Sequence, residues 1–169
     1  MIQIYTGNGK GKTTAALGLS IRALGRNKRV CLIQFMKNNF DYGEIRILKQ
    51  LSNIEIRQFG TDKLVDPNHP EPIDFQEAEN AYQAARQVLR SRKYDLVVLD
   101  EINVAVNWGL LEVEKQLLLM NENQNGKELV MTGRYAHEKV IEKADLVTEM
   151  KEIRHYFNKG FKAREGIEY

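Results

Sequence analysis

The amino-acid sequence predicts one α/β domain, residues 1–169, in which helices cover both faces of a mostly parallel, six-stranded sheet. Short apolar runs alternate along the chain with amphipathic segments of helical period. Strands and helices that alternate in this way form crossover units, which join parallel strands. Apolar runs with little polar alternation, such as Leu96–Leu99, are typical of strands buried on both faces.

Each element is predicted from its own stretch of sequence. The strands are expected at Ile2–Thr6, Arg29–Phe35, Ile54–Phe59, Leu96–Leu99, Glu128–Thr132 and Leu146–Met150. The helices between them are expected at Lys12–Leu24, Tyr42–Leu51, Phe75–Arg92, Glu112–Met120 and Glu138–Lys143. Gly25 ends the first helix, as glycine commonly does. All three prolines lie in Asp66–Pro72, so this segment is predicted to be an irregular loop.

Composition narrows the class of protein. The chain is 43% hydrophobic and 28% charged, as globular proteins are, and its net charge of +2 gives no general case for nucleic-acid binding. No apolar run approaches the roughly 18 residues of a membrane span, and the first strand begins without room for a signal peptide. The single cysteine, Cys31, lies in an apolar run and is expected to be a buried thiol. We therefore expect a cytoplasmic protein without a membrane partner.

The segment Met1–Thr14 carries the clearest chemical signal. The strand-like run Ile2–Thr6 leads into a glycine-rich turn that opens a helix at Lys12. Glycine tolerates the dihedrals that turn the N–H groups of Gly7–Lys12 inward, and the helix N-terminus adds partial positive charge. Lys12 can reach outer phosphate oxygens, and the Thr13 hydroxyl can approach Mg²⁺. The segment therefore predicts a phosphate-binding loop, or P-loop, for a nucleoside triphosphate.

The loop departs from the pattern Gly-x-x-x-x-Gly-Lys-[Ser/Thr] at its first position. The pattern requires a glycine where this chain has Thr6, and the glycine follows as Gly7. Either the loop is one residue shorter than usual, or Thr6 replaces the first glycine in a loop of normal length. The loop alone does not identify the reaction, because ATPases, kinases, GTPases and transferases all use P-loops.

An acid pair, Asp100 and Glu101, follows the apolar run Leu96–Leu99. Both carboxylates are expected at the carboxyl edge of the sheet, where open α/β sheets bind ligands. In many P-loop proteins the first acid supports Mg²⁺ and the second is the base for an attacking water. A P-loop ATPase or kinase with Glu101 as its general base is therefore one interpretation of the sequence.

Two further segments carry candidate anion ligands. Arg134 follows another apolar run, where its guanidinium can pair with phosphate oxygens. Lys159–Gly166 holds three cations and two glycines, and the interleaved Phe161, Ile167 and Tyr169 predict an ordered segment. The histidines lack metal-ligand spacing and there is one cysteine, so no zinc site is predicted.

In this order and spacing, the motifs resemble the ATP:corrinoid adenosyltransferases, a P-loop family that makes adenosylcobalamin. The resemblance covers essentially the whole chain and rests on Tyr5–Ala16, Gln34–Lys37, Val98–Ile102, Thr132–Arg134, Ala144–Glu149 and Lys162–Tyr169. It implies a RecA-like fold, a homodimer, and transfer of the 5′-deoxyadenosyl group of ATP to the Co(I) centre of a reduced corrinoid with release of triphosphate. It also implies a separate reductase that supplies Co(I), because the sequence holds no flavin or iron–sulfur motif.

Matching positions to the family pattern gives the expected site residues. Lys12 and Glu101 are expected to be catalytic, with Glu101 and Thr13 approaching Mg²⁺, so that Glu101 is a metal ligand rather than a base. The residues expected to bind the nucleotide are Gly7, Asn8, Gly9, Lys10, Gly11, Lys12, Thr13, Thr14, Arg22 and Arg134. Another alternative is a carrier that binds nucleotide and corrinoid without chemistry, which would not need this full set of phosphate-neutralising groups.

The expected corrinoid contacts differ from the family pattern. Other members use a Phe-x-Trp pair just after the third strand to displace the corrinoid's lower ligand, where this chain reads Gly60–Val65 without an aromatic residue. Lys63, Leu64 and Val65 are candidates for a different wedge, and Trp108 is an alternative.

Overall fold

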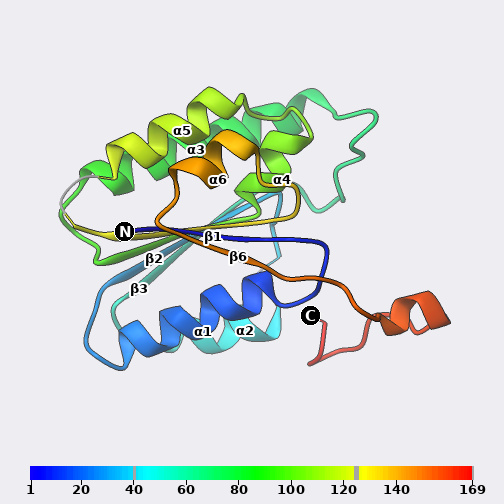
Figure 1. Ribbon diagram of the computed structural model, residues 1–169. Helices are drawn as coiled ribbons and strands as arrows, with labels where there is room; N and C mark the ends of the chain where they lie inside the picture. Colours follow the sequence, from blue (N-terminus) through cyan, green and yellow to red (C-terminus); the bar gives the residue numbers. More distant parts are fainter. Residues whose placement is uncertain (40, 124–125, 169) are drawn as a thin grey trace.

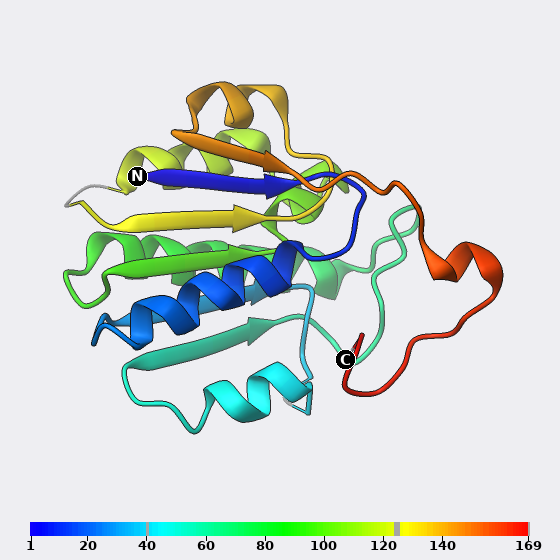
Figure 2. The same ribbon diagram turned by 60° about the horizontal axis from the view of Figure 1, so that its bottom comes forward.

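Six parallel strands form the centre of the molecule in the computed structural model, which describes residues 1–39, 41–123 and 126–168. The strands are β1 (Ile2–Thr6), β2 (Val30–Phe35), β3 (Ile54–Phe59), β4 (Leu96–Asp100), β5 (Glu128–Thr132) and β6 (Leu146–Glu149). Their order across the sheet is β3-β2-β4-β5-β1-β6 (Figure 2). Every neighbouring pair among these strands is parallel, which confirms the predicted sheet.

Helices cover both faces of the sheet, as predicted. They are α1 (Lys12–Leu24), α2 (Gly43–Leu48), α3 (Pro72–Arg90), α4 (Ile102–Asn107), α5 (Val113–Glu122) and α6 (Glu138–Lys143), followed by the 3₁₀ turn η1 (Tyr156–Lys159). Figure 1 shows α1 and α2 on one face and α3 to α6 on the other. Each layer has its own apolar core against the sheet, and β2 and β4 between the layers are buried along their whole length.

Two helices on the face that carries α3 to α6 differ from the prediction. The helix α3 begins at Pro72 rather than Phe75, because proline suits the first helical position and the Asp74 carboxylate accepts the Glu71 backbone N–H at 2.8 Å. The helix α4 was not predicted. It is six residues long, too short to show a helical period, and it starts directly after Glu101.

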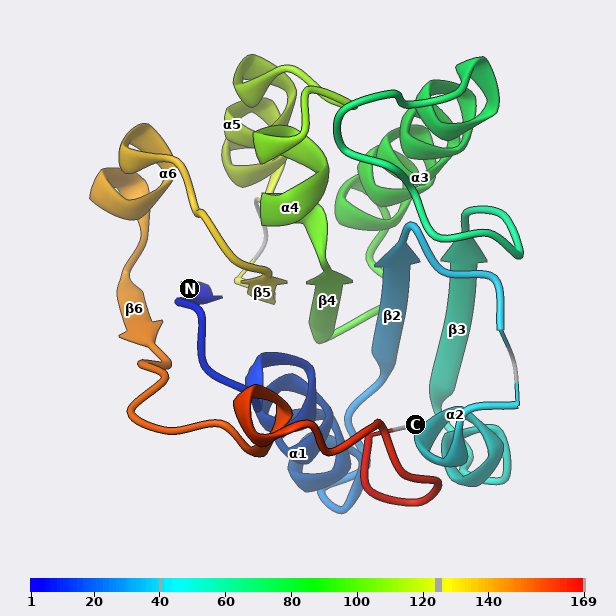
Figure 3. The ribbon, with the colours of Figure 1, turned by 90° about the vertical axis from the view of Figure 1, so that its right-hand side faces the viewer.

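All six strands end at the same edge of the sheet, which Figure 3 views from the side of the strand ends. The phosphate loop, the acid pair and the Thr132–Arg134 segment follow β1, β4 and β5 at this edge. The chain after β6 runs across the start of α1 towards α2 (Figure 3). Its last residue, Tyr169, which was predicted to belong to an ordered segment, lies outside the described residues.

Candidate active site at the carboxyl edge of the sheet

A large cavity of about 1530 Å³ lies along the carboxyl edge. Its walls come from the phosphate loop, the β2–α2 connection, the loop after β3, the ends of β4 and β5, and the C-terminal segment. Pockets that hold one small ligand are typically about 300–1,000 Å³. The cavity is therefore larger than one small ligand needs.

The phosphate loop is shaped by contact with the end of β6. Gly7 has φ +92°, and a Cβ there would lie 2.5 Å from the Met150 carbonyl oxygen. A Cβ on Gly9 would lie 2.7 Å from the same oxygen, which accepts the Gly9 N–H at 2.6 Å. Thr6 is still part of β1, so the first position of the loop pattern is extended and needs no glycine. The cavity is lined by Asn8–Thr14, whereas Gly7 packs behind the loop.

Lys12, the first residue of α1, folds back over this loop. Its ammonium donates to the carbonyl oxygens of Gly7 and Gly9, each at 2.7 Å, and the residue is 7% exposed. Burial lowers the pKa of Lys12; Arg134 acts in the same direction, while Glu101 and Asp100 oppose the shift. Two of the three ammonium protons are used by the loop, so one remains for a ligand in the cavity.

Asp100 is the buried centre of the site. Its carboxylate accepts hydrogen bonds at 2.7 to 2.9 Å from the side chains of four residues, which are Thr13, Thr132, Gln34 and Lys37. Burial alone would raise the pKa of Asp100, but the ion pair with Lys37 and these hydrogen bonds hold it below its usual value. The carboxylate is fully engaged by protein donors, so it fixes the surrounding side chains rather than meeting a ligand.

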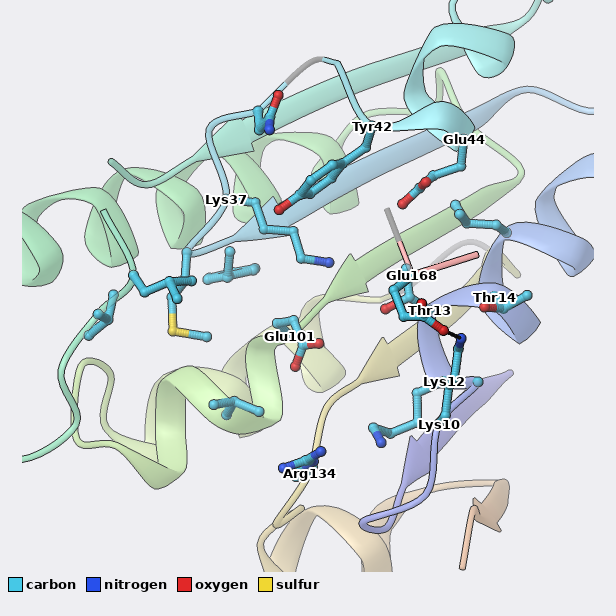
Figure 4. Close-up of a pocket in the computed structure, with 18 of the residues that line it drawn as sticks. Lys10, Lys12, Thr13, Thr14, Lys37, Tyr42, Glu44, Glu101, Arg134 and Glu168 are labelled. Atoms are coloured by element: carbon cyan, nitrogen blue, oxygen red, sulfur yellow. Dashed lines mark hydrogen bonds and ion pairs between the residues drawn. The ribbon is translucent and has the colours of Figure 1, made fainter. Parts of the chain in front are cut away.

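Glu101 is arranged differently from its neighbour. Its backbone has φ +65°, and its N–H donates to the Thr132 hydroxyl at 3.0 Å. The side chain lines the cavity, and no hydrogen bond to its carboxylate is found from the described residues. Burial and the charge of Asp100 raise the pKa of Glu101, against the effect of Lys37, Lys12 and Arg134. Figure 4 shows Glu101 among these three cations, so it is the acid that can meet a ligand.

Thr13 contacts Asp100, whereas Glu101 was the acid expected to approach Mg²⁺ together with it. Its hydroxyl donates to Asp100 Oδ1 at 2.9 Å. Because the hydrogen is used in this bond, a lone pair of the oxygen is free to face a cation in the cavity. Thr13 and Glu101 both line the cavity, as the metal-ligand expectation requires.

Lys37, Gln34 and Thr132 were not assigned to the site from the sequence. Lys37 lies 2.8 Å from Asp100, and although burial opposes it, the charges of Asp100 and Glu101 raise the pKa of Lys37. Gln34 and Thr132 are polar residues inside otherwise apolar strands, which is a signal that sequence reasoning could have used. Lys37 itself lines the cavity and adds a cation opposite the phosphate loop (Figure 4).

The two predicted arginine contacts are placed differently. Arg134 is exposed, lines the cavity and points towards Glu101 and the phosphate loop (Figure 4). Arg22 lies in the last turn of α1, ten residues after Lys12, which is about 15 Å along a helix. It is not among the residues that line the cavity. Contact between Arg22 and the nucleotide stays a prediction.

Lys10 and the C-terminal segment meet at the cavity. The Lys10 ammonium donates to Glu168 Oε1 at 2.8 Å, to Tyr156 Oη at 2.9 Å and to the Ile167 carbonyl oxygen at 3.1 Å. Its position beside the phosphates was expected, but its partners are protein groups about 150 residues away in the sequence.

The candidate corrinoid-side residues also reach the same cavity. Leu64, Val65 and Trp108 all line it, although they come from the loop after β3 and the end of α4. Leu64 is 96% exposed, whereas Val65 and Trp108 are partly buried against the core beneath α3. The structure thus brings the phosphate loop and an apolar wall into one cavity.

The fold and this site define a P-loop nucleotide-binding protein: a glycine-rich loop and lysine open α1, and a buried aspartate holds the loop threonine. The whole chain, residues 1–169, matches the family described as ATP:corrinoid adenosyltransferase BtuR/CobO/CobP. The chain belongs to this family, and it is thus an enzyme of the transferase class.

Individual relatives agree with this assignment. The chain is 35% identical to a protein of Escherichia coli (strain K12) named "Corrinoid adenosyltransferase", over all of this chain and 85% of the relative. It is 33% identical to "Corrinoid adenosyltransferase CobA" of Salmonella typhimurium (strain LT2), with the same coverage. A "Corrinoid adenosyltransferase" of Pseudomonas aeruginosa is 34% identical, over all of this chain and 83% of the relative.

Proposed function

We propose that this protein transfers the 5′-deoxyadenosyl group of ATP to the Co(I) centre of a reduced corrinoid and releases triphosphate, in the synthesis or salvage of adenosylcobalamin. The observation that carries the proposal is that one cavity is lined both by the phosphate loop and by Leu64, Val65 and Trp108. An enzyme that joins a nucleotide to a large, partly apolar second substrate needs both surfaces in one space.

In the proposed reaction, a Co–C5′ bond forms as the C5′–O5′ bond breaks, and the electron pair of the broken bond leaves with the triphosphate. No proton has to be removed, because Co(I) is itself the nucleophile. The protein must align the substrates and stabilise the charge that develops on the leaving group. Lys12, Arg134 and the loop N–H groups at the start of α1 supply positive potential for this purpose.

We further propose that Mg²⁺ accompanies ATP and is held by Thr13 and Glu101. Hydroxyl and carboxylate oxygens are the ligands that Mg²⁺ prefers, and the hydroxyl proton of Thr13 is already committed to Asp100. No group of three or more His, Cys, Asp or Glu side chains suited to a metal is found in the described part of the chain. This agrees with an ion that takes its remaining ligands from water and phosphate, as Mg²⁺ commonly does. The bound ion would neutralise charge on the triphosphate.

A P-loop ATPase or kinase is the competing function, and one observation favours it. Glu101 lines the cavity, accepts no hydrogen bond from described residues, and has a raised pKa, all of which suit a general base. Lys37, Lys12 and Arg134 surround the same carboxylate with positive charge, which instead favours the ionised, metal-binding form. The two functions differ in their products. Adenosyl transfer releases triphosphate, whereas an ATPase or kinase leaves ADP, together with inorganic phosphate or a phosphorylated acceptor.

The partners and location of the enzyme are part of the proposal. A homodimer is supported by β6, an edge strand whose residues Leu146 and Val147 are 45% and 40% exposed. A separate reductase is needed because the reaction consumes Co(I) and the sequence holds no flavin or iron–sulfur motif. The buried free thiol of Cys31 fits a reducing, cytoplasmic location. No helix in the described ranges is long and apolar enough to span a membrane.

The deciding experiment is anaerobic incubation of the protein with ATP, Mg²⁺ and chemically reduced corrinoid. The expected result is the absorption spectrum of an alkylated cobalt together with one triphosphate released for each corrinoid modified. Omission of corrinoid should stop triphosphate release. Release of inorganic phosphate at the same rate without corrinoid would establish the ATPase alternative instead.

A further inference from the structure

The C-terminal segment, residues 151–168, lies against the candidate site without an apolar anchor. None of these eighteen residues is buried. Ile153, Phe157, Phe161 and Ile167 are 92%, 69%, 57% and 58% exposed. Hydrophobic burial therefore contributes little to holding this segment in place.

One polar cluster closes the segment on itself. The Glu168 carboxylate accepts the Arg164 backbone N–H at 2.7 Å, the Arg164 guanidinium at 3.3 Å and the Tyr156 hydroxyl. The Arg164 guanidinium also lies 4.8 Å from the centre of the Tyr156 ring, close enough for a cation–π contact. These contacts hold the pKa of Glu168 well below its usual value, so the carboxylate is charged at neutral pH.

Lys10 attaches this cluster to the phosphate loop. Its bonds to Glu168, Tyr156 and the Ile167 carbonyl use three donors, which is every proton that an ammonium group has. Lys12 differs, because the loop takes two of its protons and leaves one. With the segment in this position, Lys10 has no proton left to donate to a phosphate.

The attached segment forms part of the cavity wall. His155, Gly166, Ile167 and Glu168 line the same cavity as the phosphate loop. Figure 4 shows Glu168 beside Lys10, Lys12 and Thr13, and Figure 3 shows the segment passing over the start of α1.

We propose that Lys10 is a positioning residue: it anchors residues 155–168 through Glu168 and Tyr156, and this anchored segment closes one wall of the ATP pocket. Lys10 then acts on the nucleotide through the segment, not by contact with phosphate. The inference rests on the proposed function in one respect, which is that ATP is the ligand of the phosphate loop.

The test measures the Kd for MgATP, without corrinoid, in Lys10→Met, Glu168→Gln and the double variant. Each single change should weaken ATP binding on the order of tenfold, as loss of one charge-assisted hydrogen bond does. The double variant should bind MgATP no more weakly than the weaker-binding of the two single variants, because both changes release the same segment. Trypsin should cut the C-terminal segment faster in all three variants than in the wild type.

Matched controls are Lys28→Met and Glu142→Gln, which remove the same charges from exposed positions outside this cavity. Both controls should bind MgATP as the wild type does. Lys10→Arg keeps a cation that can reach Glu168 and should retain most of the affinity. If Lys10→Met does not fold, Glu168→Gln and Lys10→Arg decide the question, since the Glu168 change must still weaken binding.

Two outcomes would overturn the proposal. If Glu168→Gln leaves the affinity for ATP unchanged or increases it, the segment is not part of the wall of the nucleotide pocket. An increase would mean that the Glu168 carboxylate competes with phosphate. If the losses in the two single variants add in the double variant, Lys10 meets the nucleotide independently. Failure of the proposed function would look different: wild-type protein would not bind MgATP, or would bind it without transferring the adenosyl group.

Discussion

Thr13, in the first turn of α1, and Asp100, at the end of β4, are joined by a hydrogen bond of 2.9 Å, although β4 and the strand that leads into α1, β1, are not neighbours in the sheet. The strand β5 lies between β1 and β4, which places them about 10 Å apart. Thr132, at the end of β5, donates to the same carboxylate oxygen at 2.7 Å. The ends of β4 and β5 and the start of α1 are therefore tied together at one buried aspartate, and the position of the phosphate loop depends on it.

The first prediction concerns Lys12. Lys12→Ala should lower the rate of adenosyl transfer on the order of 10²–10³-fold, because it removes the cation that stabilises charge on the leaving triphosphate. The fold should persist, since the lysine contacts loop carbonyls and not the apolar core. Single-turnover rates and thermal unfolding of the variant, with Lys28→Ala for comparison, provide the check. Turnover close to normal would remove Lys12 from the phosphate site.

The second prediction separates a metal ligand from a base. Glu101→Gln should lower turnover and raise the Mg²⁺ concentration needed for half-maximal rate, because an amide is a weaker Mg²⁺ ligand than a carboxylate. Rates measured across Mg²⁺ concentration and pH give the answer. If excess Mg²⁺ did not restore the turnover of Glu101→Gln, and the lost activity depended on pH as the ionisation of one group would, Glu101 would be the base of a hydrolase.

The third prediction concerns Asp100 and acid stability. Asp100→Asn removes a fully buried carboxylate and leaves the partly exposed Lys37 without its ion-pair partner, so it should cost about 1.5–3 kcal/mol of unfolding free energy at pH 7. Folding lowers the pKa of Asp100, so its stabilisation is fully present above the unfolded value near pH 4 and declines as pH falls towards the folded value.

Urea unfolding of both proteins from pH 7 to pH 3 measures this difference. The gap between wild type and Asp100→Asn should be constant at higher pH and narrow below about pH 4. Glu142→Gln, an exposed change on α6, should show no such gap. A gap that stayed constant down to pH 3 would contradict the shifted pKa.

The fourth prediction concerns the corrinoid wall. We expect the loop of residues 60–72 to cover the lower face of the corrinoid, with Leu64 and Val65 excluding the lower ligand by bulk. Aliphatic side chains form a smaller wedge than aromatic ones, so cobalamin should be a poorer substrate than a corrinoid that lacks its lower base. The spectrum of enzyme-bound Co(II), compared between wild type and a Leu64→Ala, Val65→Ala double variant, measures this effect. A double variant that forms four-coordinate Co(II) as well as wild type would show that the wedge lies elsewhere.

Local sequence patterns predicted most of the fold and part of the site. The strands and the P-loop could be predicted because each depends on residues adjacent in the chain. The pattern also led us to expect Glu101 and Arg134 at one edge of the sheet, where strand ends of a parallel sheet meet, and both line the cavity there. Arg22 does not line the cavity, and its contact with the nucleotide stays a prediction.

Other features depend on contacts that the sequence does not encode locally. One example is the difference between Asp100 and Glu101. The strand order brings the donors Thr132 and Gln34 to Asp100 rather than to Glu101. The partners of Lys10 come from residues 156–168, and no pattern near Lys10 indicates them. Family resemblance named the reaction but did not place these side chains.

The position of β1 has a consequence for synthesis of the chain on the ribosome. This strand is made first, yet its two neighbours in the sheet are β5 and β6, which are made last. The loop after β1 also takes its shape from Met150. A nascent chain that has not yet reached Met150 therefore cannot complete the nucleotide site, and β1 stays without its sheet partners until β5 has been translated. Such late pairing between distant segments slows folding and leaves an open strand edge exposed to other chains.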